Sequence, residues 1–145
     1  MKKTLLSLFL LLFLAVTASA QVDKIVGKWK TIDDKDGSEK SIVNIYKASN
    51  GNYYGKVEKL FKEPNKKCTE CDGENKGKPI VGMTVINNMV VKNGTLTGGT
   101  ILDPATGKVY KCNISFEPKT GNLKVRGSLD KKGLIGRNQT WVKGS

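Results

Sequence analysis

The chain has 145 residues, 38% of them hydrophobic, and its 25 lysines and arginines against 13 acidic residues give a formal net charge of +12 at pH 7. It contains no histidine, which is the commonest general base and a common metal ligand, so catalytic and metal-binding classes are disfavoured. The positive charge favours anionic partners such as lipid head groups or wall polymers, although the lysines are spread along the chain as on an ordinary solvated surface.

The first part of the chain has the organisation of a secretory signal peptide. Lys2 and Lys3 give a positive start, an almost continuous apolar stretch covers residues 5–16, and residues 18–20 form a small-residue cleavage motif. The apolar stretch is shorter than the roughly 20 residues of a membrane span, so we expect cleavage before Gln21 rather than retention as an anchor. The sequence predicts a signal peptide at residues 1–20, one domain at residues 21–145 without a transmembrane segment, and a periplasmic or secreted bacterial protein.

The rest of the chain consists of short segments that are apolar on alternate positions and are separated by Gly, Asn, Asp and Pro turns, a pattern typical of β-strands. Eight strands are expected, near residues 26–33, 41–47, 53–60, 80–87, 95–103, 109–117, 123–130 and 137–143. Most connections are short, which implies an up-and-down order. Closure removes the exposed edges of a free sheet, so the predicted fold is all-β, a single eight-stranded antiparallel up-and-down β-barrel.

The clearest strand pair covers residues 109–117 and 123–130, joined by a turn at residues 118–122. Alternation along both strands predicts a set of interior side chains: Tyr110, Cys112, Ile114, Phe116, Leu123, Val125, Gly127 and Leu129. Most of these residues are bulky, whereas Gly127 leaves a gap. An eight-stranded barrel is either filled by side chains or able to hold one small ligand, and the sequence permits both outcomes.

The first strand contains Gly27-Lys28-Trp29, which is similar to the Gly-x-Trp opening of the lipocalins and their relatives. In those proteins the tryptophan closes the bottom of the barrel, and a basic residue of the last strand lies across it. The resemblance implies that Gly27, Trp29, Arg137 and Trp141 close this barrel, with Arg137 over the indole of Trp29. Such a cation–π contact contributes about 0.5 to 2 kcal/mol.

A longer series of motifs is more specific than Gly-x-Trp. Its order and spacing resemble a small exported bacterial family catalogued as domain of unknown function twenty-one forty-seven, through residues 29–34, 54–57, Cys68-x-x-Cys71, 76–80, 98–104, 107–112, 124–127 and 136–141. The resemblance covers nearly all of the chain after residue 20. It implies a lipocalin-like or streptavidin-like barrel of the bacterial envelope, and it carries no settled activity.

Cys68 and Cys71 lie in the long polar connection at residues 62–79, which we expect to form a lid or rim loop. Export favours a disulfide, and the loop composition after Cys71 lacks the helix that activates a redox pair. We therefore expect a structural bridge that contributes at most about 2 kcal/mol. A redox pair and a metal site that also uses Cys112 are the alternatives. Because Cys112 alternates with core residues, we expect a buried free thiol there.

No catalytic constellation is found, so the sequence predicts a non-enzymatic protein without a cofactor or a metal site. The leading hypothesis is a binding protein that holds a small apolar or amphipathic ligand in the barrel mouth, beneath the loop at residues 62–79. One alternative is an envelope interaction protein whose solid barrel docks on anionic lipid or wall polymer. Another is a thiol–disulfide role of Cys68 and Cys71. Specific nucleic-acid binding is disfavoured, and nothing in the sequence sets the oligomeric state.

Overall fold

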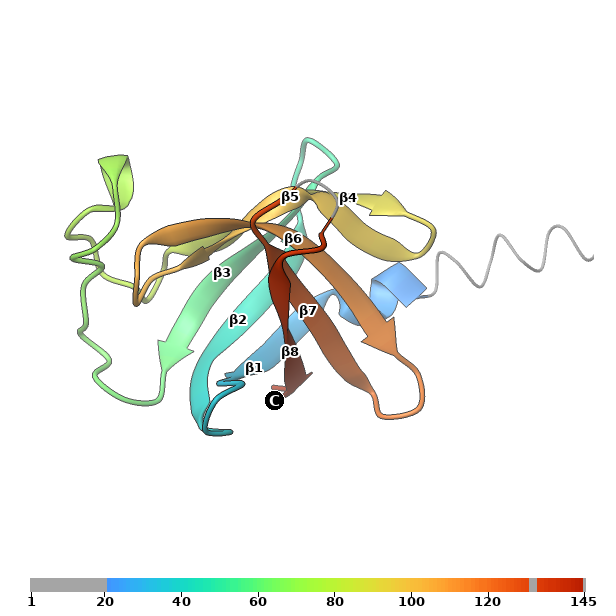
Figure 1. Cartoon of the computed structure of the whole chain (residues 1–145), viewed down its shortest axis with the longest axis horizontal. Coiled ribbons are helices and arrows are strands. Elements are labelled where there is room, and N and C mark those ends of the chain that lie inside the picture. The colour runs from blue at the N-terminus through green and yellow to red at the C-terminus, as the bar shows by residue number, and fades with distance from the viewer. Residues whose placement is uncertain (1–20, 131–132, 145) are drawn as a thin grey trace, which may run out of the picture.

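The alternating segments form eight strands that close into one antiparallel barrel (Figure 1). The structure, a computed structural model, describes residues 21–130 and 133–144, so the predicted signal peptide lies outside the described residues. Each strand pairs with the next along the chain, and the last pairs with the first, which confirms the predicted up-and-down barrel. The strands are β1 (Gly27–Ile32), β2 (Glu39–Lys47), β3 (Tyr53–Leu60), β4 (Thr84–Lys92), β5 (Thr95–Asp103), β6 (Lys108–Glu117), β7 (Asn122–Ser128) and β8 (Gly136–Lys143).

The strand pairs differ in how far they run. The β6–β7 hairpin is paired along its whole length, from Lys111 opposite Ser128 to Glu117 opposite Asn122. The closing pair, β1 with β8, has a ladder of two residue pairs, Trp29 with Lys143 and Lys30 with Val142. The barrel is therefore closed by backbone pairing at one end of this seam and by other contacts toward its opposite end.

Strand β4 begins and ends later than the sequence pattern indicates. The alternation suggests residues 80–87, whereas the strand covers Thr84–Lys92. The reason lies at Gly82, whose φ of 94° is incompatible with a strand, and residues 80–83 form a turn closed by the Met83 amide on the Ile80 carbonyl. At the other end, the strand continues to the turn at Asn93, so its apolar residues Val90 and Val91 are exposed on the β4–β5 hairpin.

The end of the barrel near the chain's first described residues is closed by a helical turn at residues 21–25 (Figure 1). Val22 and Ile25 from this turn are 4% and 0% exposed. The Trp29 indole Nε1 donates a hydrogen bond to the Ile25 carbonyl at 2.7 Å, so the first strand holds the turn in place. We call this end the closed end, and the opposite end the mouth.

Fully buried side chains fill the closed half of the barrel. Ile45, Met89, Leu96, Ile114 and Leu123 are all 0% exposed. Close packing of this kind is what holds a small domain together. Within the part of the chain that the structure describes, no helix is long and apolar enough to cross a bilayer.

Candidate functional site

The mouth half of the barrel contains a cavity of about 870 Å³. Its walls are apolar side chains that point inward from five strands: Val43, Val57, Val85, Ile101 and Val125. Trp141, which is 2% exposed, also lines it. A volume above about 300 Å³ is typical of a small-molecule site, so the interior is hollow rather than solid at this end. The hypothesis of a solid barrel is wrong for this half of the molecule.

A few polar side chains interrupt the apolar wall. The hydroxyls of Thr31 and Ser41 are hydrogen-bonded to each other at 2.7 Å, and the Trp141 Nε1 donates to the Gln139 Oε1 at 2.9 Å. Tyr110 lines the same cavity. Because Thr31 pairs with Ser41 and Trp141 pairs with Gln139, these groups add little polarity to the cavity. Sparse, fixed polar groups in a mostly apolar wall are the usual composition of a site that binds an amphipathic molecule.

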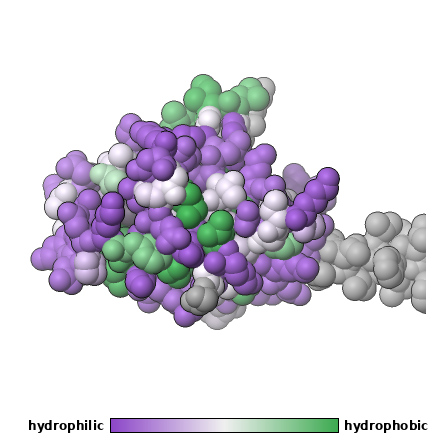
Figure 2. Space-filling model, turned by 90° about the horizontal axis from the view of Figure 1, so that it is seen from below, coloured by the Kyte–Doolittle hydropathy of each residue, from purple (hydrophilic) through white to green (hydrophobic). Residues whose placement is uncertain are grey.

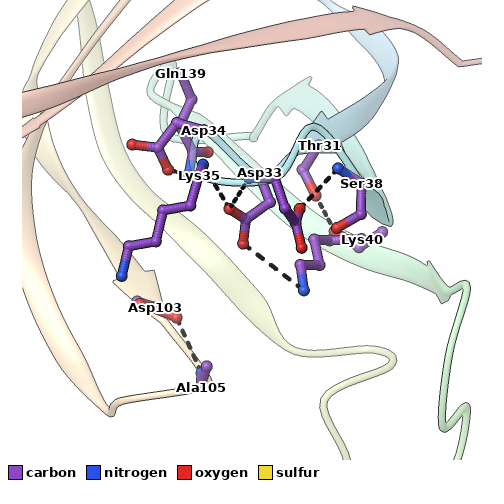
Figure 3. Close-up of polar contacts among 11 residues, drawn as sticks. Thr31, Asp33, Asp34, Lys35, Ser38, Lys40, Asp103, Ala105 and Gln139 are labelled. Atoms are coloured by element: carbon purple, nitrogen blue, oxygen red, sulfur yellow. Dashed lines mark hydrogen bonds and ion pairs between the residues drawn. The ribbon is translucent and has the colours of Figure 1, made fainter.

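Charged residues surround the mouth, on the turn between β1 and β2 and on the neighbouring strands and connections (Figure 3). The turn is ordered by Asp33, whose Oδ1 accepts the Lys35 amide at 2.7 Å and whose Oδ2 lies 3.7 Å from the Lys40 Nζ. In Figure 3 the Lys35 side chain extends from this turn in the direction of Asp103 on the facing side. Neither Lys35 nor Lys62, both at the rim, has a carboxylate within 4.0 Å among the described residues.

Side chains rather than backbone pairing bridge the β1–β8 seam at the mouth. Asp34, which directly follows β1, accepts an ion pair from the Arg137 Nε at 2.8 Å. The Gln139 Nε2 donates to the same carboxylate at 3.4 Å (Figure 3). The backbone ladder of this seam covers Trp29–Lys30 only, so these contacts take its place beside the cavity. The β1–β8 seam is therefore joined by backbone hydrogen bonds at the closed end and by the side chains of Asp34, Arg137 and Gln139 at the mouth. We call these three side chains the polar clasp.

The long connection between β3 and β4 reaches the mouth with its first part only. Lys62, Glu63 and Lys66 line the cavity, whereas the segment around the 3₁₀ turn η1 (Gly73–Asn75) extends away from the barrel (Figure 1). Cys68 and Cys71 form a disulfide and are 0% and 2% exposed, with their Cα atoms 5.4 Å apart. The expectation that residues 62–79 cover the mouth is thus wrong for most of the loop.

The segment that the disulfide bridges packs against the β5–β6 turn. The Cys68 Sγ lies 3.3 Å from the Pro104 carbonyl oxygen. A Cβ atom at Gly107 would lie 1.9 Å from the Glu70 carbonyl oxygen, so only glycine allows the loop to come this close. The bridged segment therefore supports the side of the barrel instead of closing its end.

The expected interior residues of β6 and β7 are divided between the two halves. Ile114 and Leu123 are fully buried in the closed half, and Phe116 packs against the core there. Tyr110, Val125 and Gly127 line the cavity. Leu129 was expected inside but is 66% exposed, because β7 ends at Ser128 and the Leu129 amide instead donates to the Ile135 carbonyl in the β7–β8 loop.

Gly127 provides part of the hollow space. A Cβ atom placed there would lie 3.4 Å from the Tyr110 Cβ and 3.7 Å from the Ile101 Cγ2, which are ordinary contact distances. No close approach demands a glycine at this position. The missing side chain leaves the wall between Tyr110 and Ile101 open to the cavity.

The residues expected to close the barrel lie at different ends of it. Trp29 is 0% exposed at the closed end, and Gly27 adopts a φ of 133° where the chain enters β1. The placement of Arg137 over Trp29 is wrong, since the Lys143 Nζ lies 5.2 Å from the Trp29 ring centroid. Strand β8 runs antiparallel to β1, so its beginning, with Arg137, lies at the mouth and its end lies beside Trp29.

Cys112 lies between Gly99 and Gly127 on the neighbouring strands and is 1% exposed. Burial raises the pKa of the Cys112 thiol to about 12, so the thiol stays protonated and unreactive near neutral pH. Among residues 21–130 and 133–144, no three His, Cys, Asp or Glu side chains are grouped so that they could hold a metal ion.

The sequence pattern did not reveal the helical turn at residues 21–25, which fills the closed end and which we call the plug. Val22 and Ile25 are apolar and three positions apart, which is the spacing of one helical face, but a single turn is too short for periodicity to identify. It also missed Asp34 as the partner of Arg137 and Gln139, because Asp34 and Gln139 are separated by 105 positions in the sequence. Only the closure of β8 onto β1 brings them together.

Comparisons with known proteins agree with this geometry. Residues 27–143 match a family described as an uncharacterized protein conserved in bacteria, DUF2147. The fold is similar to that of protein HP1028 from Helicobacter pylori, described as belonging to the lipocalin family, with a TM-score of 0.71, 21% identity and coverage of 83% of this chain and 82% of that chain. No curated protein sequence matches this chain. Since the family match spans β1 to β8, the chain belongs to the bacterial DUF2147 family and has a lipocalin-like barrel.

Proposed function

We propose that this protein is a non-enzymatic carrier or receptor that holds one small amphipathic molecule in the mouth half of its barrel. The observation that carries the proposal is the cavity of about 870 Å³ with an apolar wall and a charged rim. An apolar part of the ligand would lie against Val43, Val57 and Ile101, and its polar end would lie among the rim side chains. Burial of apolar surface contributes about 25 cal/mol per Å², so such a wall supplies affinity without a specific hydrogen-bond pattern.

A binding experiment tests this proposal directly. Protein purified without denaturant should show the added mass of a bound small molecule in native mass spectrometry, or it should take up a fluorescent fatty-acid analogue. Dodecanoic acid, dodecanol and dodecylamine, which share one tail, should compete for the analogue because the tail provides the shared apolar area. If none of the three competes and no added mass is found, the proposal is wrong.

A cavity-filling variant links the binding to the site. Val125→Phe places a ring in the cavity and should weaken binding of the analogue by tenfold or more, which corresponds to about 1.4 kcal/mol. Val109→Phe, on an exposed valine of β6, is the matched control and should bind as the native protein does. Equal affinities in the two variants would place the analogue elsewhere on the molecule.

We further propose that the protein works outside the cytoplasm after removal of residues 1–20. The positive start, the apolar stretch and the small-residue motif support this location, as does a disulfide, which persists mainly in oxidising compartments. Sequencing the protein from a periplasmic or culture fraction should give Gln21 as the first residue. Met1 at the start of the mature protein would contradict the proposal.

For the cysteine pair we propose a structural role instead of thiol–disulfide exchange. Both cysteines are buried, and a redox-active thiol needs access to its partner. Mild reductant should leave the pair intact in the folded protein. Rapid release of two thiols under those conditions would favour the catalytic alternative.

A further inference from the structure

The three most exposed large apolar residues that the structure describes all lie beside the mouth. Leu129, Leu134 and Ile135 are 66%, 76% and 63% exposed, and we call them the rim cluster. Figure 2 shows hydrophobic residues standing out from an otherwise hydrophilic face. Leu129 and Ile135 also belong to the cavity wall, so the cluster is continuous with the opening. Exposed apolar residues grouped in this way mark an interaction surface more often than isolated ones do.

Hydrogen bonds hold the described residues that carry the rim cluster. The Asp130 carboxylate accepts the amides of Leu134 at 3.1 Å and Ile135 at 2.8 Å. The Arg126 Nε donates to the Gly133 carbonyl at 2.9 Å from the neighbouring strand. These contacts hold the backbone of residues 133–135, while the aliphatic side chains remain exposed to water. An anchored loop loses little conformational entropy when its side chains are buried by a partner.

The net charge of the chain, +12 at pH 7, favours an anionic partner. Every acidic residue of the rim accepts an ion pair or a hydrogen bond within this chain: Asp33, Asp34, Asp36, Glu39, Glu63, Asp103 and Asp130. Lys35 and Lys62 have no carboxylate within 4.0 Å in the described ranges. The amides that Asp36 and Asp103 accept are neutral and do not cancel the charge of these carboxylates, so the excess of positive charge belongs to the whole chain, with 25 basic and 13 acidic residues.

We propose that the rim cluster docks the barrel mouth onto the surface of an anionic lipid bilayer. Leu129, Leu134 and Ile135 would enter the boundary between head groups and acyl chains, and Lys35 and Lys62 would lie among the anionic head groups. A bilayer suits this surface better than a second copy of the chain, because a twofold contact would bring the same lysines toward each other. Docking in this orientation turns the cavity opening toward the lipid, and it does not depend on whether a ligand occupies the cavity.

Vesicle binding of matched variants tests the proposal. Flotation with phosphatidylcholine vesicles, with and without phosphatidylglycerol, should show binding that requires phosphatidylglycerol. Binding should weaken as added salt shortens the Debye length from about 10 Å at 0.1 M to about 3 Å at 1 M. The variant Leu134→Ser with Ile135→Ser should bind at least about tenfold more weakly than the native protein, because it removes the apolar area that the bilayer takes out of water.

The closed end of the barrel supplies the control. Val90 and Val91 are 43% and 50% exposed on the β4–β5 hairpin, so Val90→Ser with Val91→Ser removes two exposed apolar side chains from the opposite end. This variant should bind vesicles as the native protein does. Both pairs are exposed, and far-ultraviolet circular dichroism should show an unchanged fold for both variants.

A fluorescent label reports the orientation independently. Cys112 is buried and Cys68 is bonded to Cys71, so a new cysteine at Leu134→Cys or Val91→Cys takes the label selectively. An environment-sensitive dye at position 134 should shift to the blue on vesicles, and the dye at position 91 should not. Equal shifts, equal loss of binding in both serine variants, or no binding to either vesicle type would overturn the proposal.

Self-association is the remaining outcome that would overturn it. If the native protein forms dimers without lipid and the Leu134→Ser with Ile135→Ser variant is monomeric, the rim cluster is a contact between copies. The outcomes are separable from the proposed function. Vesicle binding without uptake of the fatty-acid analogue would refute the cavity hypothesis and leave the docking surface intact.

Discussion

The closed end and the mouth of this barrel are built from the same eight strands, yet they differ in almost every physical property. At the closed end, Ile25, Trp29, Ile114 and Leu123 are all 0% exposed and fill the interior. At the mouth, the same strands enclose a cavity of about 870 Å³. The difference shows that stability and binding capacity are separated along the length of each strand. Residues near the closed end hold the fold, and residues a few positions further along determine what the barrel can contain.

Strand β7 shows the change most directly. Its inward positions become smaller toward the mouth, from Leu123 through Val125 to Gly127. Polar groups enter at the same level on other strands, with the Thr31–Ser41 hydroxyl pair and Gln139. Smaller side chains create the space, and self-satisfied polar groups line it without a large desolvation cost.

The largest effect is expected at Trp29. Trp29→Ala would remove a fully buried ring, its hydrogen bond to the Ile25 carbonyl and its contact with Lys143, and it should lower the free energy of unfolding by about 3–5 kcal/mol. Urea denaturation measures the change. Lys143→Ala is the control, since it removes the cation alone and should cost about 0.5–1 kcal/mol. A loss below about 1 kcal/mol for Trp29→Ala would mean that the plug contributes little to the closed end.

Two isoleucines compare the halves with the same substitution. Ile114 is fully buried, whereas Ile101 is partly exposed and borders the cavity. Ile114→Ala should cost about 2–5 kcal/mol because it opens a void in a packed region. Ile101→Ala should cost less than half of that, since it enlarges a space that already exists. Chemical denaturation of both variants under one set of conditions checks the difference, and equal losses would argue against a hollow mouth.

Two glycines compare the halves by the addition of a methyl group instead of its removal. A Cβ atom at Gly99 would lie 2.0 Å from the Asn87 carbonyl oxygen and 2.7 Å from the Met89 Sδ, so Gly99→Ala should cost at least about 1–3 kcal/mol. Gly127→Ala meets only ordinary contacts and should change the unfolding free energy by no more than about 0.5–1 kcal/mol, with stabilisation expected because strand glycines cost backbone entropy. Thermal melting followed by circular dichroism separates the two. A strongly destabilised Gly127→Ala would show that the space beside Tyr110 is not free.

The smallest effect on stability is expected at the polar clasp. The Arg137 side chain is 56% exposed, so its ion pair with Asp34 contributes less than about 1 kcal/mol. Arg137→Gln should leave the unfolding free energy nearly unchanged. Under the proposed function, loosening the β1–β8 seam at the mouth should speed dissociation of the fatty-acid analogue, as measured by stopped-flow displacement. A slower dissociation would contradict a role of the clasp in retaining the ligand.

Much of the fold follows from local sequence patterns. Strands β3 (Tyr53–Leu60) and β5 (Thr95–Asp103) have the bounds expected from their alternation, because Asn and Gly precede each strand and a proline follows each one closely. Strand β4 was displaced because the turn at Gly82 falls inside an apolar run that looks continuous in the sequence. Alternation identifies a strand well where turn residues define its ends and poorly where they do not.

The site depends on contacts that no local pattern contains. The sequence indicates a gap at Gly127 among the interior side chains. It does not indicate which half of the barrel is hollow, because that depends on the plug formed by Val22 and Ile25. Arg137 was assigned to the wrong end because the register between β8 and β1 decides which basic residue meets Trp29, and Lys143 has that position. The exposure of Leu129 likewise follows from the end of β7 at Ser128.

The barrel is thus packed at one end and hollow at the other. The most direct test is the unfolding free energy of two substitutions on inward positions of β7, Leu123→Phe in the packed half and Val125→Phe in the cavity wall. Leu123→Phe should lose about 1–3 kcal/mol through overpacking, whereas Val125→Phe should stay within about 1 kcal/mol of the native protein because the ring enters empty space. A Val125→Phe variant that is destabilised as much as Leu123→Phe would contradict the account.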